Sequence, residues 1–158
     1  LLSISYKEVH LCRCGNDVID AILNCSAAEA KKQQIYFQYE VNFTAHIPVA
    51  PVDLCAILGN QIENALEANR QIADISARYV KIMLTQKKGF LIFRVENASA
   101  ENPFSENGAL KTRKEDGNLH GLGIKNIQDT VNKYNGWLKN SYDDHTFISE
   151  VLLCVSTV

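Results

Sequence analysis

Two short motifs constrain the fold of this chain more than any other feature of its sequence. One is a pair of asparagines four residues apart, and the other is a later pair of glycines at the start of another predicted helix. Apolar residues recur at near-helical spacing around the first pair, so Asn60 and Asn64 are predicted to project from one face, one turn apart. We predict Asp53, two residues after Pro51, as the N-cap of this helix. Mg²⁺ needs only one or two protein oxygens beside phosphates and waters, and neutral amides supply them without repelling a polyphosphate. By itself, however, the pair is also typical of the solvent edge of an ordinary amphipathic helix.

The glycine pair makes a nucleotide pocket the better interpretation. Gly121 and Gly123 leave the backbone bare where a helical period begins at Ile124. Backbone N–H groups at the positive end of a helix can hold phosphate oxygens. The segment lacks both the longer glycine pattern of a dinucleotide fold and the Gly-Lys-Ser/Thr of a P-loop, so these two folds are disfavoured.

The two motifs resemble those of a known superfamily. Residues 60–68 (NQIENALEA) look like the N box, and residues 118–126 (NLHGLGIKN) look like the second glycine box, of the GHKL superfamily of Bergerat-fold ATP-binding domains. From about residue 16 to 155 the chain most closely resembles the catalytic domain of quorum-sensing-type sensor histidine kinases. The resemblance implies binding of ATP and Mg²⁺.

Periodicity along the rest of the chain predicts an α/β fold. We expect a helix over Asp17–Lys32, a strand over 35–43, a hairpin with strands around 80–84 and 91–95, and two final strands over 137–141 and 146–155. The helix opened by the glycines is expected to end near Tyr134, with Gly136 as a left-handed C-cap. These elements favour an α/β sandwich, a mixed sheet with helices packed on one face, which the resemblance narrows to the Bergerat fold.

The resemblance also implies roles for particular residues. Asn60 and Asn64 would ligate Mg²⁺, and Asn97 would accept a hydrogen bond from the adenine amino group where most relatives carry Asp in D-x-G-x-G. A strand-end turn is the alternative reading of Asn97. The polar, glycine- and proline-interrupted segment 98–119 would form a mobile lid. The remaining nucleotide-binding residues would be Lys114 at the terminal phosphate and His120, Gly121, Leu122 and Gly123 in the glycine box.

Asn60 also bears on the type of reaction. Hydrolytic GHKL proteins carry Glu at the corresponding position, where it serves as a general base toward water, whereas an amide has no useful basicity. We therefore expect phosphoryl transfer to a protein histidine, with Asn60 as the catalytic position and Glu63 or Glu67 as remaining candidate bases. A protein-serine kinase of the anti-sigma type and a catalytically silent nucleotide-dependent binding module are the alternatives.

Length and composition agree with one domain. The 158 residues, 46% hydrophobic, can bury a single core, and we expect a catalytic domain over 14–158 preceded by the end of a helix or linker over 1–13. No acceptor-histidine motif is recognisable, so the expected partners are a separate dimerisation segment with the phosphoacceptor and a response regulator. The net charge of −2 lacks a strongly basic block, which gives no support for nucleic-acid binding. No apolar run is long enough to span a membrane, so we expect a cytoplasmic domain of a membrane-anchored sensor without membrane contact of its own.

The five cysteines are an odd set on mostly apolar segments and are predicted to be reduced. Cys12 and Cys14 have a spacing that could bind a metal, but no second Cys/His pair at a zinc-like spacing accompanies them. A structural zinc and disulfide bonds are therefore both disfavoured.

Overall fold

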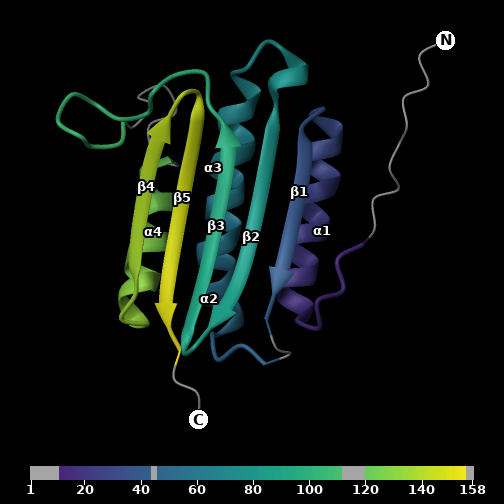
Figure 1. Cartoon of the computed structure of the whole chain (residues 1–158), viewed down its shortest axis with the longest axis vertical. Coiled ribbons are helices and arrows are strands. Elements are labelled where there is room, and N and C mark those ends of the chain that lie inside the picture. The colour runs from purple at the N-terminus through teal and green to yellow at the C-terminus, as the bar shows by residue number, and fades with distance from the viewer. Residues whose placement is uncertain (1–10, 44–45, 112–119, 156–158) are drawn as a thin grey trace.

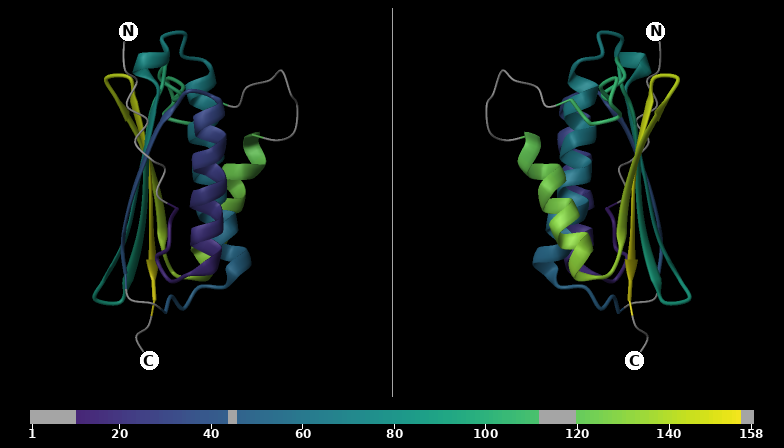
Figure 2. Two further views of the ribbon diagram at one scale, coloured as in Figure 1. Left: turned by 90° about the vertical axis from the view of Figure 1, so that its right-hand side faces the viewer. Right: turned by 90° about the vertical axis from the view of Figure 1, so that its left-hand side faces the viewer.

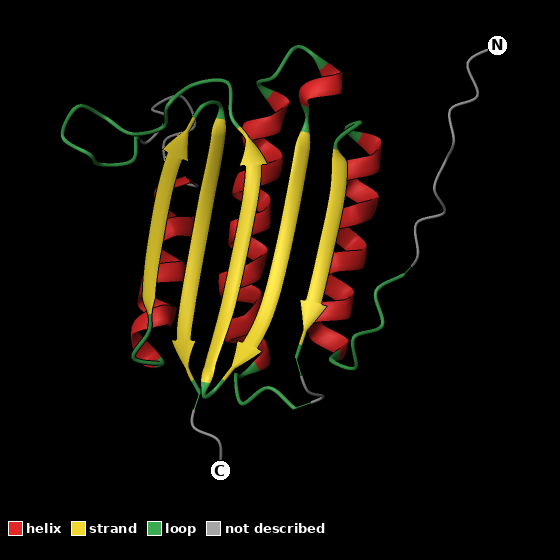
Figure 3. Cartoon of the chain, in the orientation of Figure 1, coloured by secondary structure: helices red, strands yellow, loops and turns green. Residues whose placement is uncertain are grey.

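A mixed five-stranded sheet carries all the helices on one of its faces, as Figures 1 and 2 show. The computed structural model describes residues 11–43, 46–111 and 120–155, with only the backbone of His120 and Gly121. Figure 3 separates its helices from its strands. In chain order the elements are α1 (Asp17–Lys32), β1 (Tyr36–Asn42), α2 (Pro51–Leu54), a π-helical turn (Cys55–Gly59), α3 (Asn60–Arg70), a 3-10 turn (Ile75–Ala77), β2 (Tyr79–Lys87), β3 (Phe90–Ala98), α4 (His120–Lys133), β4 (Trp137–Asp143) and β5 (Thr146–Cys154).

The sheet has the strand order β1-β2-β3-β5-β4. β1 and β2 are parallel and are joined through α2 and α3, whereas the other neighbours are antiparallel. The β2–β3 hairpin turns at Lys88 and Gly89, and the β4–β5 hairpin at Asp144 and His145, all with positive φ. Two central residues with positive φ give a turn whose twist matches that of the flanking strands. The predicted α/β sandwich with a mixed sheet covered on one face is confirmed.

The core lies between the sheet and the helices. Val80, Ile82 and Leu84 of β2 alternate with exposed residues and point to the helical face, as Leu91, Phe93 and Val95 of β3 do. Fully burying each such side chain stabilises the fold by about 1.5–3 kcal/mol. The helices contribute buried residues at helical spacing, among them Ile19, Leu23, Ile57, Leu58, Ile62, Leu66, Ile127 and Val131. The central helix α3 therefore lies over the middle of the sheet and fixes the direction of Asn60 and Asn64.

Helix α1 has the predicted bounds, and β1 is shorter than predicted. Asn16 is the N-cap of α1, because its Oδ1 accepts from the N–H groups of Val18 and Ile19 at 3.1 Å. All five cysteines are free, as predicted. Among the described residues, no helix is both long enough and apolar enough to cross a membrane.

Two predicted helix caps are wrong. The N-cap of α2 is Ala50, and Asp53 lies in the first turn instead, where its carboxylate binds the last residue of α4 and the residue after it. At the end of α4 the left-handed residue is Asn135, with φ of 48°, and not Gly136. Asparagine tolerates this conformation. Gly136 is required for a different reason, because a Cβ there would lie 2.1 Å from the backbone oxygen of Leu152.

Asp53 joins the start of α2 to the end of α4. Its two carboxylate oxygens accept from Lys133 Nζ at 3.0 Å and from the Tyr134 hydroxyl at 2.7 Å. The Tyr134 oxygen in turn accepts from the N–H of Ala50 at 3.1 Å. The hydrogen bond from Tyr134, and then that from Lys133, lower the pKa of Asp53. The α2 helix, which leads through the π-helical turn into α3, is thus tied to the end of α4 that is remote from Gly123.

We expect Asp53→Asn to reduce the free energy of unfolding by about 1.5–3 kcal/mol at neutral pH, the usual contribution of a hydrogen bond to a charged group. Because the folded pKa is lowered, the wild-type advantage is complete above the unfolded value of about 3.9 and fades as the pH falls through the folded pKa. Urea unfolding at pH 7 and at stepwise lower pH measures this difference. The exposed Asp129 of α4 supplies the control variant Asp129→Asn. A difference that grows below pH 4 would contradict the assignment.

Candidate functional site

The two sequence motifs meet where α3 packs against α4. Gly123 lies in the opening turns of α4, and a Cβ placed on it would come within 3.2 Å of Asn60 Oδ1 and 3.7 Å of Asn64 Oδ1. Both amide oxygens therefore converge on the bare backbone of Gly123. The tertiary fold brings together residues that lie far apart in the sequence.

A π-helical turn orients the first asparagine. Asn60 follows directly after the π-helical turn, and its Nδ2 donates to the carbonyl of Ala56 in that turn at 2.6 Å. This hydrogen bond fixes the amide so that Oδ1 faces Gly123. The side chain of Asn64 makes no hydrogen bond to any residue in the described part of the chain, which leaves its oxygen available. Single π turns within α-helices occur frequently at functional sites.

The donor set fits a magnesium ion bound to a polyphosphate. Two neutral oxygens one helical turn apart match the small number of protein ligands that Mg²⁺ takes beside phosphates and waters. The N–H groups in the first turn of α4 have no intrahelical partner and lie at the positive helix end, where they favour phosphate oxygens. Gly123 keeps this surface clear of a side chain.

Two buried amides anchor α3 to the sheet. Asn69 exchanges two hydrogen bonds of 3.0 Å with the backbone of Tyr79, at the start of β2. Gln61 donates to Ser149 of β5 at its backbone oxygen and its hydroxyl, at 3.2 and 3.1 Å. These bonds set the position of Asn60 and Asn64 relative to the strand ends.

Asn97 lies near the end of β3, at the same end of the sheet as Asn69. It is 2% exposed and is paired with Val80 on β2 and Phe147 on β5. Its Nδ2 donates to the carbonyl of Ala98 at 2.8 Å, so its Oδ1 remains as the acceptor for a ligand. An acceptor in this position suits an amino group such as that of adenine.

Comparison with known proteins decides the family. The sequence profile described as "GHKL domain" matches residues 49–154, about two thirds of the chain. The chain belongs to the GHKL domain family. No curated protein sequence matches it.

Solved structures share the fold of this GHKL domain. The catalytic domain of histidine kinase ThkA aligns with a TM-score of 0.69 and 17% identity, covering 89% of this chain and 91% of that chain. The Acinetobacter baumannii histidine kinase AdeS aligns with a TM-score of 0.62 and 14% identity, covering 89% of this chain and 64% of that one. The blue-light activated histidine kinase of Erythrobacter litoralis has a TM-score of 0.64 and 13% identity, with 87% and 61% covered. At these identities the similarity shows the shared Bergerat-type α/β fold.

The glycine box opens a helix, as predicted. α4 begins at His120, so Gly121 and Gly123 lie inside its first turns, ahead of the apolar period that begins at Ile124. The close approach of α3 explains why glycine occupies position 123 despite its weak helix propensity. Leu122 is 50% exposed and points away from the core. The side chain of His120 and the whole of Lys114 lie outside the described residues, so their predicted phosphate contacts stay predictions.

The first part of the expected lid is a hydrogen-bonded loop. Ala98 still belongs to β3, so the predicted boundary at 98 is wrong by one residue. Ser99 N–H donates to the carbonyl of His145 at 2.8 Å, and Phe104 packs on Phe147 with 6.2 Å between ring centroids. A single bridge between Phe104 and Leu110 closes the loop. Residues 112–119 lie outside the described residues, and closure over a ligand stays a prediction.

Glu63, one of the two candidate bases, is exposed on α3. Its carboxylate is 3.7 Å from Arg70, whose Nε donates to Gln33 beside α1. The roles of Glu63 and Glu67 as candidate bases stay predictions.

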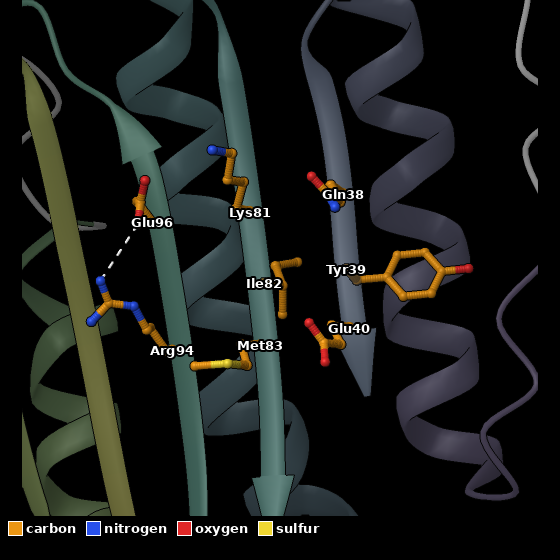
Figure 4. Close-up of a pocket in the computed structure, with 8 residues that line it drawn as sticks. All are labelled: Gln38, Tyr39, Glu40, Lys81, Ile82, Met83, Arg94 and Glu96. Atoms are coloured by element: carbon orange, nitrogen blue, oxygen red, sulfur yellow. Dashed lines mark hydrogen bonds and ion pairs between the residues drawn. The ribbon is translucent and has the colours of Figure 1, made fainter. Parts of the chain in front are cut away.

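A separate cavity of about 210 Å³ lies on the opposite, helix-free face of the sheet (Figure 4). It crosses β1, β2 and β3, and its charged walls include Glu40, Lys81 and the ion pair of Arg94 with Glu96 at 3.5 Å. The sheet separates it from Asn60 and Asn64, so it is not the nucleotide site.

Sequence reasoning missed the π-helical turn. The apolar pattern gave no signal for it, because the buried Leu54, Leu58 and Ile62 follow one another at regular helical steps of four residues.

Replacement of Asn97 by alanine, but not by aspartate, is expected to weaken ATP binding. Asn97→Ala should reduce ATP affinity by about 1–3 kcal/mol, because it leaves the adenine amino group without an acceptor. Asn97→Asp should retain acceptance from that group. Both variants lose the bond to Ala98, so their thermal unfolding is compared separately. Calorimetric titration with ATP and with GTP is the measurement, and equal wild-type affinity for the two nucleotides would refute the role of Asn97.

Proposed function

We propose that this chain is the ATP-binding catalytic domain of a sensor histidine kinase of the quorum-sensing type. Residues 14–158 form that domain, and residues 1–13 lead into it from a preceding helix or linker. The domain transfers the terminal phosphoryl group of ATP to a histidine on a dimerisation segment. The observation that carries the proposal is the convergence of Asn60 and Asn64 oxygens on Gly123.

The residues of the site support transfer better than hydrolysis. Asn60 holds its amide against Ala56 and offers only a neutral oxygen, which cannot take a proton from water. The first turn of α4 holds phosphate oxygens, Asn97 selects adenine, and Lys114 neutralises the terminal phosphate. Asn60 and Asn64 would hold Mg²⁺, which would offset the negative charge that develops on the phosphates.

The reaction then needs only a correctly placed acceptor. A ring nitrogen of the histidine forms a bond to the terminal phosphorus as the bond from that phosphorus to the bridging oxygen breaks, and ADP leaves with the electron pair. A response regulator receives the phosphoryl group from the histidine afterwards. The parent protein is in this proposal a membrane-anchored sensor, with this domain on the cytoplasmic side.

The test compares the chain alone with the chain mixed with its native dimerisation segment. Alone with Mg-ATP, we expect slow phosphate release and negligible labelling of the chain. With the segment, we expect an acid-labile, base-stable phosphohistidine that a His→Ala change in the acceptor removes. An Asn64→Ala chain supplies the matched control, since it keeps the segment contact and loses the nucleotide site.

Three outcomes would overturn the proposal in different ways. Rapid hydrolysis by the chain alone would indicate an ATPase. Acid-stable phosphoserine on a partner would indicate a protein-serine kinase of the anti-sigma type. Tight ATP binding without transfer to the native segment would indicate a catalytically silent binding module.

A further inference from the structure

A second cluster of ligand-type side chains lies away from the nucleotide site, where the chain enters α1. The sulfur atoms of Cys12 and Cys14 and a carboxylate oxygen of Asp20 all lie within 4.8 Å of one another. Cys12 is buried, and Cys14 and Asp20 are partly exposed. The sequence spacing alone did not predict this cluster, because Asp20 joins it only when the loop folds back on the helix.

We infer that Cys12, Cys14 and Asp20 form a binding site for a Zn²⁺ ion. Zinc takes thiolate sulfur at about 2.3 Å and carboxylate oxygen at about 2.0–2.2 Å in a tetrahedral arrangement, so two ligand atoms of one ion lie roughly 3.5–3.8 Å apart. The three ligand atoms lie within 4.8 Å of one another, so they would draw together by up to about 1 Å when the ion binds. Two thiolates with one carboxylate suit zinc, whereas a copper(I) site would favour sulfur ligands throughout.

The backbone around the cluster is held in place by α1. The N–H of Cys12 donates to Asn24 Oδ1 at 2.7 Å, and Asn24 Nδ2 donates back to the carbonyl of Cys12 at 3.2 Å. The N–H of Cys14 donates to Asp20 Oδ1 at 2.8 Å, which orients the carboxylate toward the loop. Gly15, with φ of 91°, provides the turn between the cysteines and the helix. The ligands are therefore positioned before any ion binds.

Zinc binds the thiolate form of cysteine, so a Zn²⁺ ion would replace the protons of both thiols, which leave to solvent. With three protein ligands, the fourth position of a tetrahedral site remains for water.

The proposed zinc site would hold the loop that precedes α1 against that helix. Hydrogen bonds, the burial of Cys12 and the packing of Cys14 against the core hold the loop from Leu11 to Gly15 on the domain. Zinc would add direct bonds between this loop and the first turn of the helix. This inference is independent of the nucleotide site and of the proposed kinase activity.

The experiment titrates the reduced, metal-free 158-residue chain with Zn²⁺ against a chromophoric chelator, and with Co²⁺ in a spectrophotometer. We expect one equivalent of each metal and a thiolate-to-cobalt charge-transfer band. Cys14→Ser should lose the band, and Asp20→Asn should weaken zinc binding more than about tenfold, since even outer-shell partners of metal ligands contribute about 10–100-fold. Zinc should also raise the unfolding temperature of the wild type and not that of Cys14→Ser.

Cys25→Ser is the matched control, because Cys25 is an exposed cysteine on the same helix and outside the cluster. It should bind zinc and cobalt as the wild type does. Since Cys14 is only partly buried, Cys14→Ser is expected to fold, and far-UV circular dichroism checks this. The inference is overturned if the reduced wild type shows no charge-transfer band, if the band persists in folded Cys14→Ser, or if it disappears in Cys25→Ser.

Discussion

Asn64→Ala is expected to lower the affinity for ATP in the presence of Mg²⁺ by about tenfold to a hundredfold or more, the loss seen even for outer-shell partners of a metal. The reason is that Asn64 Oδ1 and Asn60 Oδ1 converge on Gly123, and the Asn64 side chain makes no hydrogen bond within the described part of the chain. Removal of the amide therefore deletes a ligand without breaking a structural bond. Calorimetric titration with ATP measures the change.

The decisive comparison repeats the titration with EDTA in place of Mg²⁺. If Asn64 acts through the ion, the wild type and Asn64→Ala should bind metal-free ATP with nearly equal affinity. Asn132→Ala is the matched control, because Asn132 is an exposed asparagine on α4, bonded to Gln128 at 3.0 Å. A loss of the same size with and without Mg²⁺ would show that Asn64 contacts the nucleotide itself, and unchanged affinity would remove it from the site.

Gly136→Ala is expected to reduce the free energy of unfolding by about 3 kcal/mol or more, at the upper end of the range for overpacked positions. A Cβ at this position would lie 2.1 Å from the backbone oxygen of Leu152, in the interior strand β5. The obstacle is backbone that is hydrogen-bonded on both sides, so it cannot move as a flexible side chain would. Urea unfolding followed by circular dichroism measures the loss.

Gly59→Ala provides a control with the opposite sign. Gly59 has helical dihedral angles, and a Cβ there would meet nothing within 4 Å. Alanine should therefore stabilise the chain by about 0.5–1 kcal/mol through its higher helix propensity. A Gly136→Ala chain as stable as the wild type would show that β5 yields at Leu152, and the close packing of the turn after α4 against β5 would then not be a constraint.

Prediction from sequence succeeded where the local conformational preference or the periodicity of the residues determines the structure. The apolar period of α1 and the alternation along β2 and β3 report directly which side of each element is buried. The N box and the glycine box were found for a related reason, since their residue types and order carry the chemistry. The predicted caps at Asp53 and Gly136 failed, because each residue has a tertiary contact that outweighs its local preference.

The sequence by itself determined the elements, their buried faces and the family motifs, because helical and strand periods depend only on neighbours along the chain. The tertiary structure determined which of these motifs lie next to one another. Asn60 and Asn64 reach Gly123 only because α3 and α4 pack closely, and Asp53 reaches Lys133 and Tyr134 for the same reason. Asp20 joins Cys12 and Cys14 only through a loop held by Asn24. Such contacts depend on distances and directions across the whole fold, and these are set by packing the helices onto the sheet.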